Sequence, residues 1–74
     1  MNKERRAQVA KIISEAEELK SKLESVLEQE QEYYDNVPEN LQNSERYQTS
    51  EECISNMEDA ITSFDDIIDG LSNI

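Results

Sequence analysis

Apolar residues recur along the chain every three or four positions, in two series separated by a polar middle segment. The first series covers residues 9–33 and the second covers residues 47–71, and each has one polar member, Glu30 and Ser50. Such spacing gathers side chains on one face of an α-helix and matches the a and d positions of a heptad repeat. We therefore expect an all-α protein with two helices that pack through these faces. The first series is Val9, Ile12, Ala16, Leu19, Leu23, Val26, Glu30 and Tyr33, and the second is Tyr47, Ser50, Ile54, Met57, Ile61, Phe64, Ile68 and Leu71.

The two series match each other when the chain folds back at Asn40. Each member of the first then faces one member of the second, so that Glu30 meets Ser50 and Tyr33 meets Tyr47. This pairing predicts an antiparallel two-helix hairpin, similar to a coiled coil, as the single domain of residues 1–74.

The middle stretch EYYDNVPENLQNSERY supplies the turn. Pro38 disfavours helical geometry at Val37, and asparagines before and after it suit turns and caps. Ser44 is a good N-cap for a following helix. We place the first helix at residues 3–35, the turn at residues 36–44 and the second helix at residues 45–70. Gly70 either ends the second helix or lies within it, because Leu71 still continues the apolar series.

Each helix has one further column of residues spaced by seven. In the first helix it is Ile13, Lys20, Leu27 and Tyr34, and in the second it is Cys53, Ala60, Ile67 and Ile74. A hairpin of this size has a small core, and its single cysteine excludes an internal disulfide. We therefore expect a homo-oligomeric helical bundle in which Ile13, Leu27, Ile67 and Ile74 mediate self-association, one apolar column on each broad side. A different protein on these columns is the alternative.

Charge is distributed unevenly along the chain. Residues 1–22 carry six Lys or Arg and four Glu, whereas residues 23–74 carry one Arg and fourteen Asp or Glu. Phosphate binding requires clustered basic residues, so we expect no direct binding of nucleic acid. A basic protein surface is the expected partner. The fold-back should also bring Lys3, Arg5, Arg6 and Lys11 near Asp65, Asp66 and Asp69.

No motif in the sequence predicts catalysis or a bound cofactor. The chain has no histidine and no glycine-rich phosphate loop. Cys53 lacks an activating base, and DDIIDG at residues 65–70 departs from a calcium loop at its third position, Ile67. Glu30 is best explained as a polar position that fixes the register with Ser50. We expect a non-enzymatic protein without metal or cofactor. No apolar run suits a membrane span or a signal peptide, so we expect a cytoplasmic location.

The stretch EYYDNVPENLQNSERYQTSEECISNMEDAI resembles a group of small acidic proteins encoded by phages and prophages of Gram-positive bacteria. The resemblance covers most of the chain and implies a phage-related accessory protein. It implies no chemistry and no functional residues.

Two functions fit these observations. The first is a binding module that engages a host or phage protein and inhibits it. In a more specific version of this hypothesis, rows of carboxylates mimic DNA. Its candidate partner-binding residues are Tyr34, Glu32, Asp35, Glu39, Glu51, Glu52 and Asp59. The second is a structural role as an oligomeric coiled-coil spacer or assembly protein.

Overall fold

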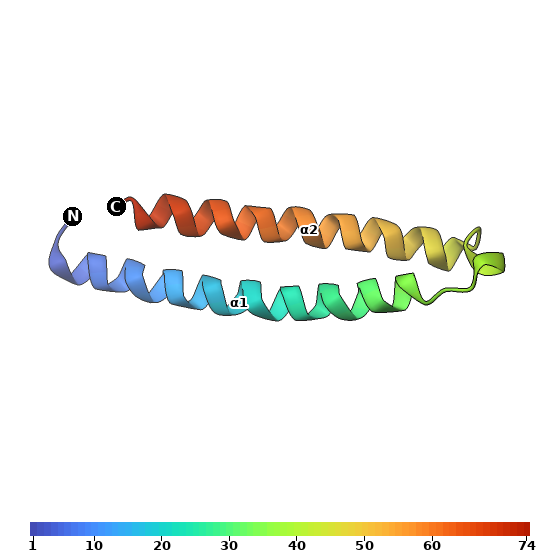
Figure 1. Cartoon of the computed structure of the whole chain (residues 1–74). Coiled ribbons are helices and arrows are strands. Elements are labelled where there is room, and N and C mark those ends of the chain that lie inside the picture. Colours follow the sequence, from blue (N-terminus) through green and yellow to red (C-terminus); the bar gives the residue numbers. More distant parts are fainter.

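The computed structural model describes all residues 1–74 and consists of two long antiparallel helices. Helix α1 spans Lys3–Asp35, a short 3-10 helix η1 spans Glu39–Leu41, and α2 spans Glu45–Ser72. The two long helices lie side by side, with both termini at one end and the turn at the other (Figure 1). The molecule measures 60 × 15 × 13 Å and is a helical hairpin. Neither helix contains a segment with the length and hydropathy needed to cross a bilayer.

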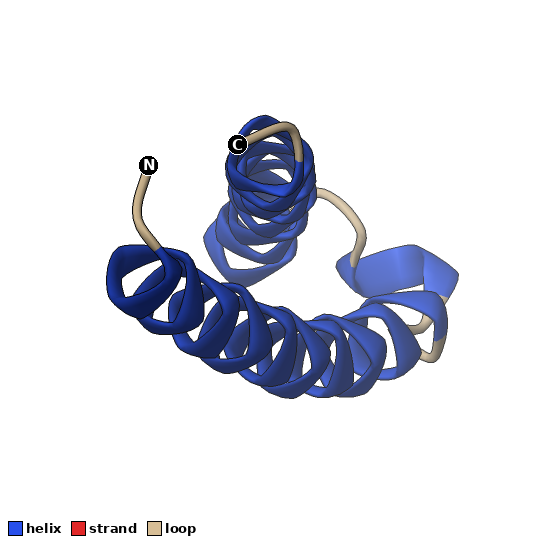
Figure 2. Ribbon diagram, turned by 90° about the vertical axis from the view of Figure 1, so that its left-hand side faces the viewer, coloured by secondary structure: helices blue, strands red, loops and turns tan.

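The ends of the helices are fixed by local capping. The Asn2 side chain accepts a hydrogen bond from the Arg5 amide at 2.8 Å, and Ser44 Oγ accepts one from the Tyr47 amide at 3.2 Å. The N-cap expected at Ser44 is therefore confirmed. Helix α2 continues two residues past the expected end, through Gly70, whose φ is not positive. Between the helices, η1 turns the chain around the end of the rod (Figure 2).

The contact between α1 and α2, which we call the seam, is thin. Only Ala16, Ser50 and Ile54 are buried. On α2 the less exposed residues are those of the expected series and Ala60. On α1 they are Val9, Ile13, Ala16, Lys20, Leu23, Leu27, Glu30, Gln31 and Tyr34.

The side of α1 that faces α2 differs from the expected one. Ile12, Leu19, Val26 and Tyr33 were assigned to the seam, but they are about half exposed, at 50%, 52%, 51% and 49%. The neighbouring column Ile13, Lys20, Leu27 and Tyr34 takes their place. Consecutive residues lie about 100° apart around a helix, and the column of Val9, Ala16, Leu23 and Glu30 stays in the seam. The helix α1 is therefore turned by roughly half that angle from the orientation that the sequence suggested.

Three contacts across the seam fix the register. Ser50 Oγ donates a hydrogen bond to Glu30 Oε2 at 2.5 Å, which confirms the expected polar pair. Tyr47 stacks on Tyr34 rather than on Tyr33, with ring centroids 4.3 Å apart and planes inclined by 9°. Asp65 pairs with Lys20 at 2.5 Å.

The ion pairs expected at the open end are not formed. The guanidinium of Arg6 instead donates to the backbone carbonyls of Met1 and Ile74, at 3.1 and 3.2 Å. Besides Lys20–Asp65, the one ion pair present joins Lys22 to Glu18 along the same helix.

Candidate functional site

The hairpin has two broad sides, and the rotation of α1 gives them opposite chemistry. Tyr33 and Cys53 line one hollow across the seam, together with Arg46, Thr49, Glu30, Glu45 and Ser50. Residues seven apart repeat the same position in a coiled coil, so the columns that start at Tyr33 and Cys53 run along one side of the hairpin. We call this side the apolar face. Its members are Ile12, Leu19, Val26, Tyr33, Cys53, Ala60 and Ile67.

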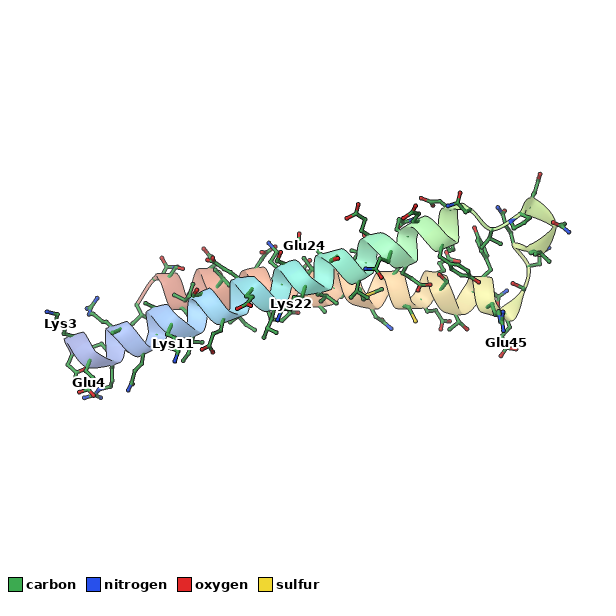
Figure 3. The ribbon with its side chains drawn as sticks, turned by 90° about the horizontal axis from the view of Figure 1, so that it is seen from below. Lys3, Glu4, Lys11, Lys22, Glu24 and Glu45 are labelled. Atoms are coloured by element: carbon green, nitrogen blue, oxygen red, sulfur yellow. The ribbon has the colours of Figure 1, made fainter.

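Few carboxylates lie along the apolar face. The columns that border it are Gln8, Glu15, Lys22 and Gln29 on α1, and Thr49, Asn56, Ser63 and Gly70 on α2. Glu15 is the one acidic residue in these columns, in a chain with 18 Asp and Glu. Figure 3 shows Lys22 and Glu24 projecting from opposite edges of α1, so these two residues mark the two broad sides of the hairpin. Depletion of Asp and Glu is typical of the core of a protein–protein interface.

The opposite side, the acidic face, carries an open groove near the turn. The groove has a volume of about 840 Å³ and its floor includes Leu27 and Ile61. Its rim contains five carboxylates and no Lys or Arg, so it presents negative charge to solvent. The rim residues are Glu24, Glu28, Gln31, Glu32, Asp35, Asn36, Glu58 and Thr62.

The expected partner-binding residues fall in several places. Glu32 and Asp35 lie on the rim of the groove. Glu39 is exposed in η1, and Glu51, Glu52 and Asp59 are exposed along α2. The structure therefore brings only two of the seven candidates together in one groove. Glu24, which the sequence did not single out, joins them because it lies two to three turns before them on the same helix.

Tyr34 is not the exposed tyrosine that the sequence suggested. It is half-buried and stacked on Tyr47, whereas Tyr33 is the ring directed to the apolar face. Hydrogen bonding with Tyr47, partial desolvation and the nearby Glu51 carboxylate raise the pKa of Tyr34 from 10.0 to about 12. Likewise, the hydrogen bond to Asp65 raises the pKa of Lys20 above 10.5.

The four residues expected to mediate self-association are also divided. Ile67 is half exposed on the apolar face. Ile13 and Leu27 lie in the seam and are partly exposed, Leu27 on the floor of the acidic groove. Ile74 lies beyond the end of α2 and lines a hollow at the open end with Val9, Ile13 and Leu71. The exposed column on α1 is instead Ile12, Leu19, Val26 and Tyr33, and the lack of acidic residues beside it was the available signal.

A second apolar hollow lies at the turn. It has a volume of about 780 Å³ and is lined by Tyr33, Val37, Pro38, Leu41 and Tyr47, together with Gln29, Glu32, Asn36, Ser44 and Arg46. Because Tyr33 and Arg46 line both this hollow and the one beside Cys53, the apolar face continues into the turn.

No cluster of three or more His, Cys, Asp or Glu side chains has the geometry to hold a metal ion. Compared with known proteins, the chain matches no family model, no curated protein and no solved structure. By its fold and its two faces, the protein is an amphipathic helical hairpin with one apolar and one acidic broad face.

Proposed function

We propose that this protein is a non-enzymatic accessory protein that binds a basic protein surface through its acidic groove. The observation that carries the proposal is the set of five groove carboxylates, from Glu24 to Asp35 on α1 and Glu58 on α2. None of them forms an ion pair within the chain. A partner that supplies Lys or Arg side chains is attracted over a long range and is oriented by this field.

More specifically, we propose that the protein is a phage-related inhibitor that occupies the nucleic-acid site of a host or phage protein. The rod carries 18 carboxylates along 60 Å. Duplex DNA carries one phosphate per ~1.7 Å of its axis, so the rod has about half as many acidic groups per unit length, and its net charge of −11 gives about a third of the charge density. This density and the elongated shape support mimicry of a nucleic acid.

A structural role as an oligomeric spacer is the second candidate function. It is favoured by a different observation, the half-exposed column of Ile12, Leu19, Val26 and Tyr33. A spacer needs only its own copies, whereas the acidic module needs a basic partner.

The test is affinity capture from a nuclease-treated bacterial lysate at low and high salt, with three baits. The first bait is the native chain. The second is Glu28→Gln/Glu32→Gln/Asp35→Asn, which removes three charges from the groove. The third is Glu52→Gln/Asp59→Asn/Asp66→Asn, which removes three charges from exposed positions spaced by seven on α2.

We expect a basic nucleic-acid-handling protein to be captured by the native and α2 baits at low salt, and lost with the groove bait. High salt should release it, because exposed charges are screened beyond about 8 Å at physiological ionic strength. Capture that is insensitive to salt, or equal for the two variant baits, would contradict binding through the groove. Recovery of only the chain itself would favour the spacer.

A further inference from the structure

We propose that the apolar face binds the same face of a second copy, with the two hairpins antiparallel, so that a four-helix bundle forms. This pairing rests on the apolar face and not on the proposed function of the groove. The pairing has a defined surface, orientation and register. In this arrangement both acidic faces stay on the outside of the bundle.

The exposed area of the single hairpin is large for its mass. A compact monomer of 8.6 kDa is expected to expose about 4,700 Å². The hairpin exposes 5805 Å². The excess, about 1,100 Å², is similar to the area that one partner contributes to a stable interface, about 800 Å². A second copy on the apolar face would remove area of this size and would cover Ile12, Leu19, Val26 and Tyr33.

The charge on the apolar face permits pairing of like chains. The chain has a net charge of −11, which opposes association through most of its surface. Along the apolar face and its border, however, Arg5, Lys22 and Arg46 balance Glu15 and the two carboxylates in the hollow beside Cys53, Glu30 and Glu45. Two copies can therefore meet here without bringing rows of carboxylates together, and their acidic grooves remain in water on opposite sides.

The antiparallel orientation follows from the charges at the two ends. The turn end presents Glu39 and Glu45 with Arg46, and the start of α1 at the open end presents Lys3 and Arg5 with Glu4, so the two have opposite net charge. Antiparallel hairpins place each turn beside the open end of the other copy, where these charges attract. Parallel hairpins would gather both acidic turns at one end.

The register follows from the symmetry of the α1 column. Its four members are evenly spaced, so a two-fold axis between Leu19 and Val26 pairs Leu19 with Val26 of the second copy and Ile12 with Tyr33. The contacts Lys20–Asp65 and Glu30–Ser50 place Ala60 close to the level of this axis. Ala60 then meets Ala60 of the second copy, and Cys53 lies opposite Ile67.

Disulfide trapping tests orientation and register together. Ala60→Cys in a Cys53→Ser background should crosslink into a dimer under mild oxidation. Ile67→Cys in the same background should not, because the two residues 67 lie about 21 Å apart along the bundle, at ~1.5 Å per residue. Ile67→Cys with the natural Cys53 retained should crosslink again, through two disulfides that each join Cys53 of one copy to the thiol introduced at position 67 of the other.

The state of association is measured by sedimentation equilibrium. We expect the native chain to sediment at twice its 8.6 kDa mass. Leu19→Lys/Val26→Lys should return it to the mass of one chain. The matched control Ser14→Lys/Ser21→Lys adds the same charges to exposed positions of α1 away from the apolar face and should remain dimeric.

A native chain that stays monomeric up to its solubility limit would overturn the proposal. Crosslinking of Cys53→Ser/Ile67→Cys with none of Cys53→Ser/Ala60→Cys would overturn the register. Because these experiments use the protein alone, a failure of groove binding leaves their outcome unchanged.

Discussion

The two broad sides of the hairpin are built from the same two helices but differ in almost every property. The apolar face has Ile12, Leu19, Val26 and Ile67 half exposed and a single carboxylate in its bordering columns. The acidic face has five carboxylates around one groove and no basic residue there. Because both sides are open to solvent, burial within the chain does not explain the difference. The comparison indicates that the apolar face is suited to a contact that excludes water, and the acidic face to a contact between charged groups.

The largest effect is expected where the two sides meet, at the seam. Ile54→Ala removes a buried side chain and should lower the free energy of unfolding by about 2–4 kcal/mol. This is comparable with the ~3–5 kcal/mol that a core of this size supplies.

Ile67→Ala makes the same change on the apolar face. We expect it to lower the melting temperature less, and mainly at protein concentrations high enough for the native chain to associate, because it weakens association. Circular dichroism melts over a range of concentrations distinguish the two, and equal effects at all concentrations would remove the distinction between seam and face.

A smaller effect is expected from the polar contact of the seam. Ser50→Ala removes the donor to Glu30 and leaves a partly buried carboxylate without its partner, at a cost of about 1–3 kcal/mol. Glu30→Leu/Ser50→Ala replaces both groups by apolar ones and should recover the loss. The control is Ser55→Ala, an exposed serine on the same helix. Urea unfolding measures all three, and a double variant no more stable than Ser50→Ala would contradict this account.

The tyrosine pair gives a test that depends on pH. The raised pKa of Tyr34, about 12, means that the folded hairpin favours the neutral phenol. The stability that this contributes is complete below the unfolded pKa of 10.0 and should be lost as the pH rises from there to about 12. Absorbance at the phenolate band should show one late titration, which Tyr34→Phe abolishes. Titration of Tyr34 at its ordinary pKa in the folded protein would contradict the close contact of Tyr34 with Tyr47.

The smallest effect is expected from single charges on the two sides. Glu58→Gln relieves repulsion in the acidic groove and should raise stability by up to about 0.5 kcal/mol. Glu15→Gln removes the single carboxylate bordering the apolar face and should change stability less, since it has fewer like charges nearby. Thermal melts at low and high salt measure the difference. Salt should reduce the benefit of Glu58→Gln, because added ions screen the same repulsion.

Much of the fold could be predicted from the pattern of residues. The a and d spacing, Pro38 and the Ser44 cap were enough to give two helices, their direction and nearly all of their ends. The pair Glu30 and Ser50 also gave the register correctly, because one polar position in each series has a single partner of its kind.

The candidate sites could be predicted only in part. The acidic character of the chain was evident, but the groove needs Glu24 and Glu58 from different helices, and their proximity depends on how the helices are turned. The apolar face was assigned to the wrong column of α1 for the same reason. Tyr33 and Tyr34 are adjacent in sequence, and only the stacking on Tyr47 decides which of them is in the seam.

The sequence by itself determined a helical hairpin, because hydrophobic periodicity and turn residues act over short distances along the chain. The tertiary structure alone decided the rotation of α1. Its two neighbouring columns, Ile12 to Tyr33 and Ile13 to Tyr34, are both largely apolar and differ by about 100° around the helix. Whichever of the two columns faces α2, it stays partly exposed in a two-helix contact. The burial of apolar side chains therefore differs little between the two orientations of α1. The partners on α2, Asp65 for Lys20 and Tyr47 for Tyr34, distinguish them instead, and this choice leaves the other column as the apolar face.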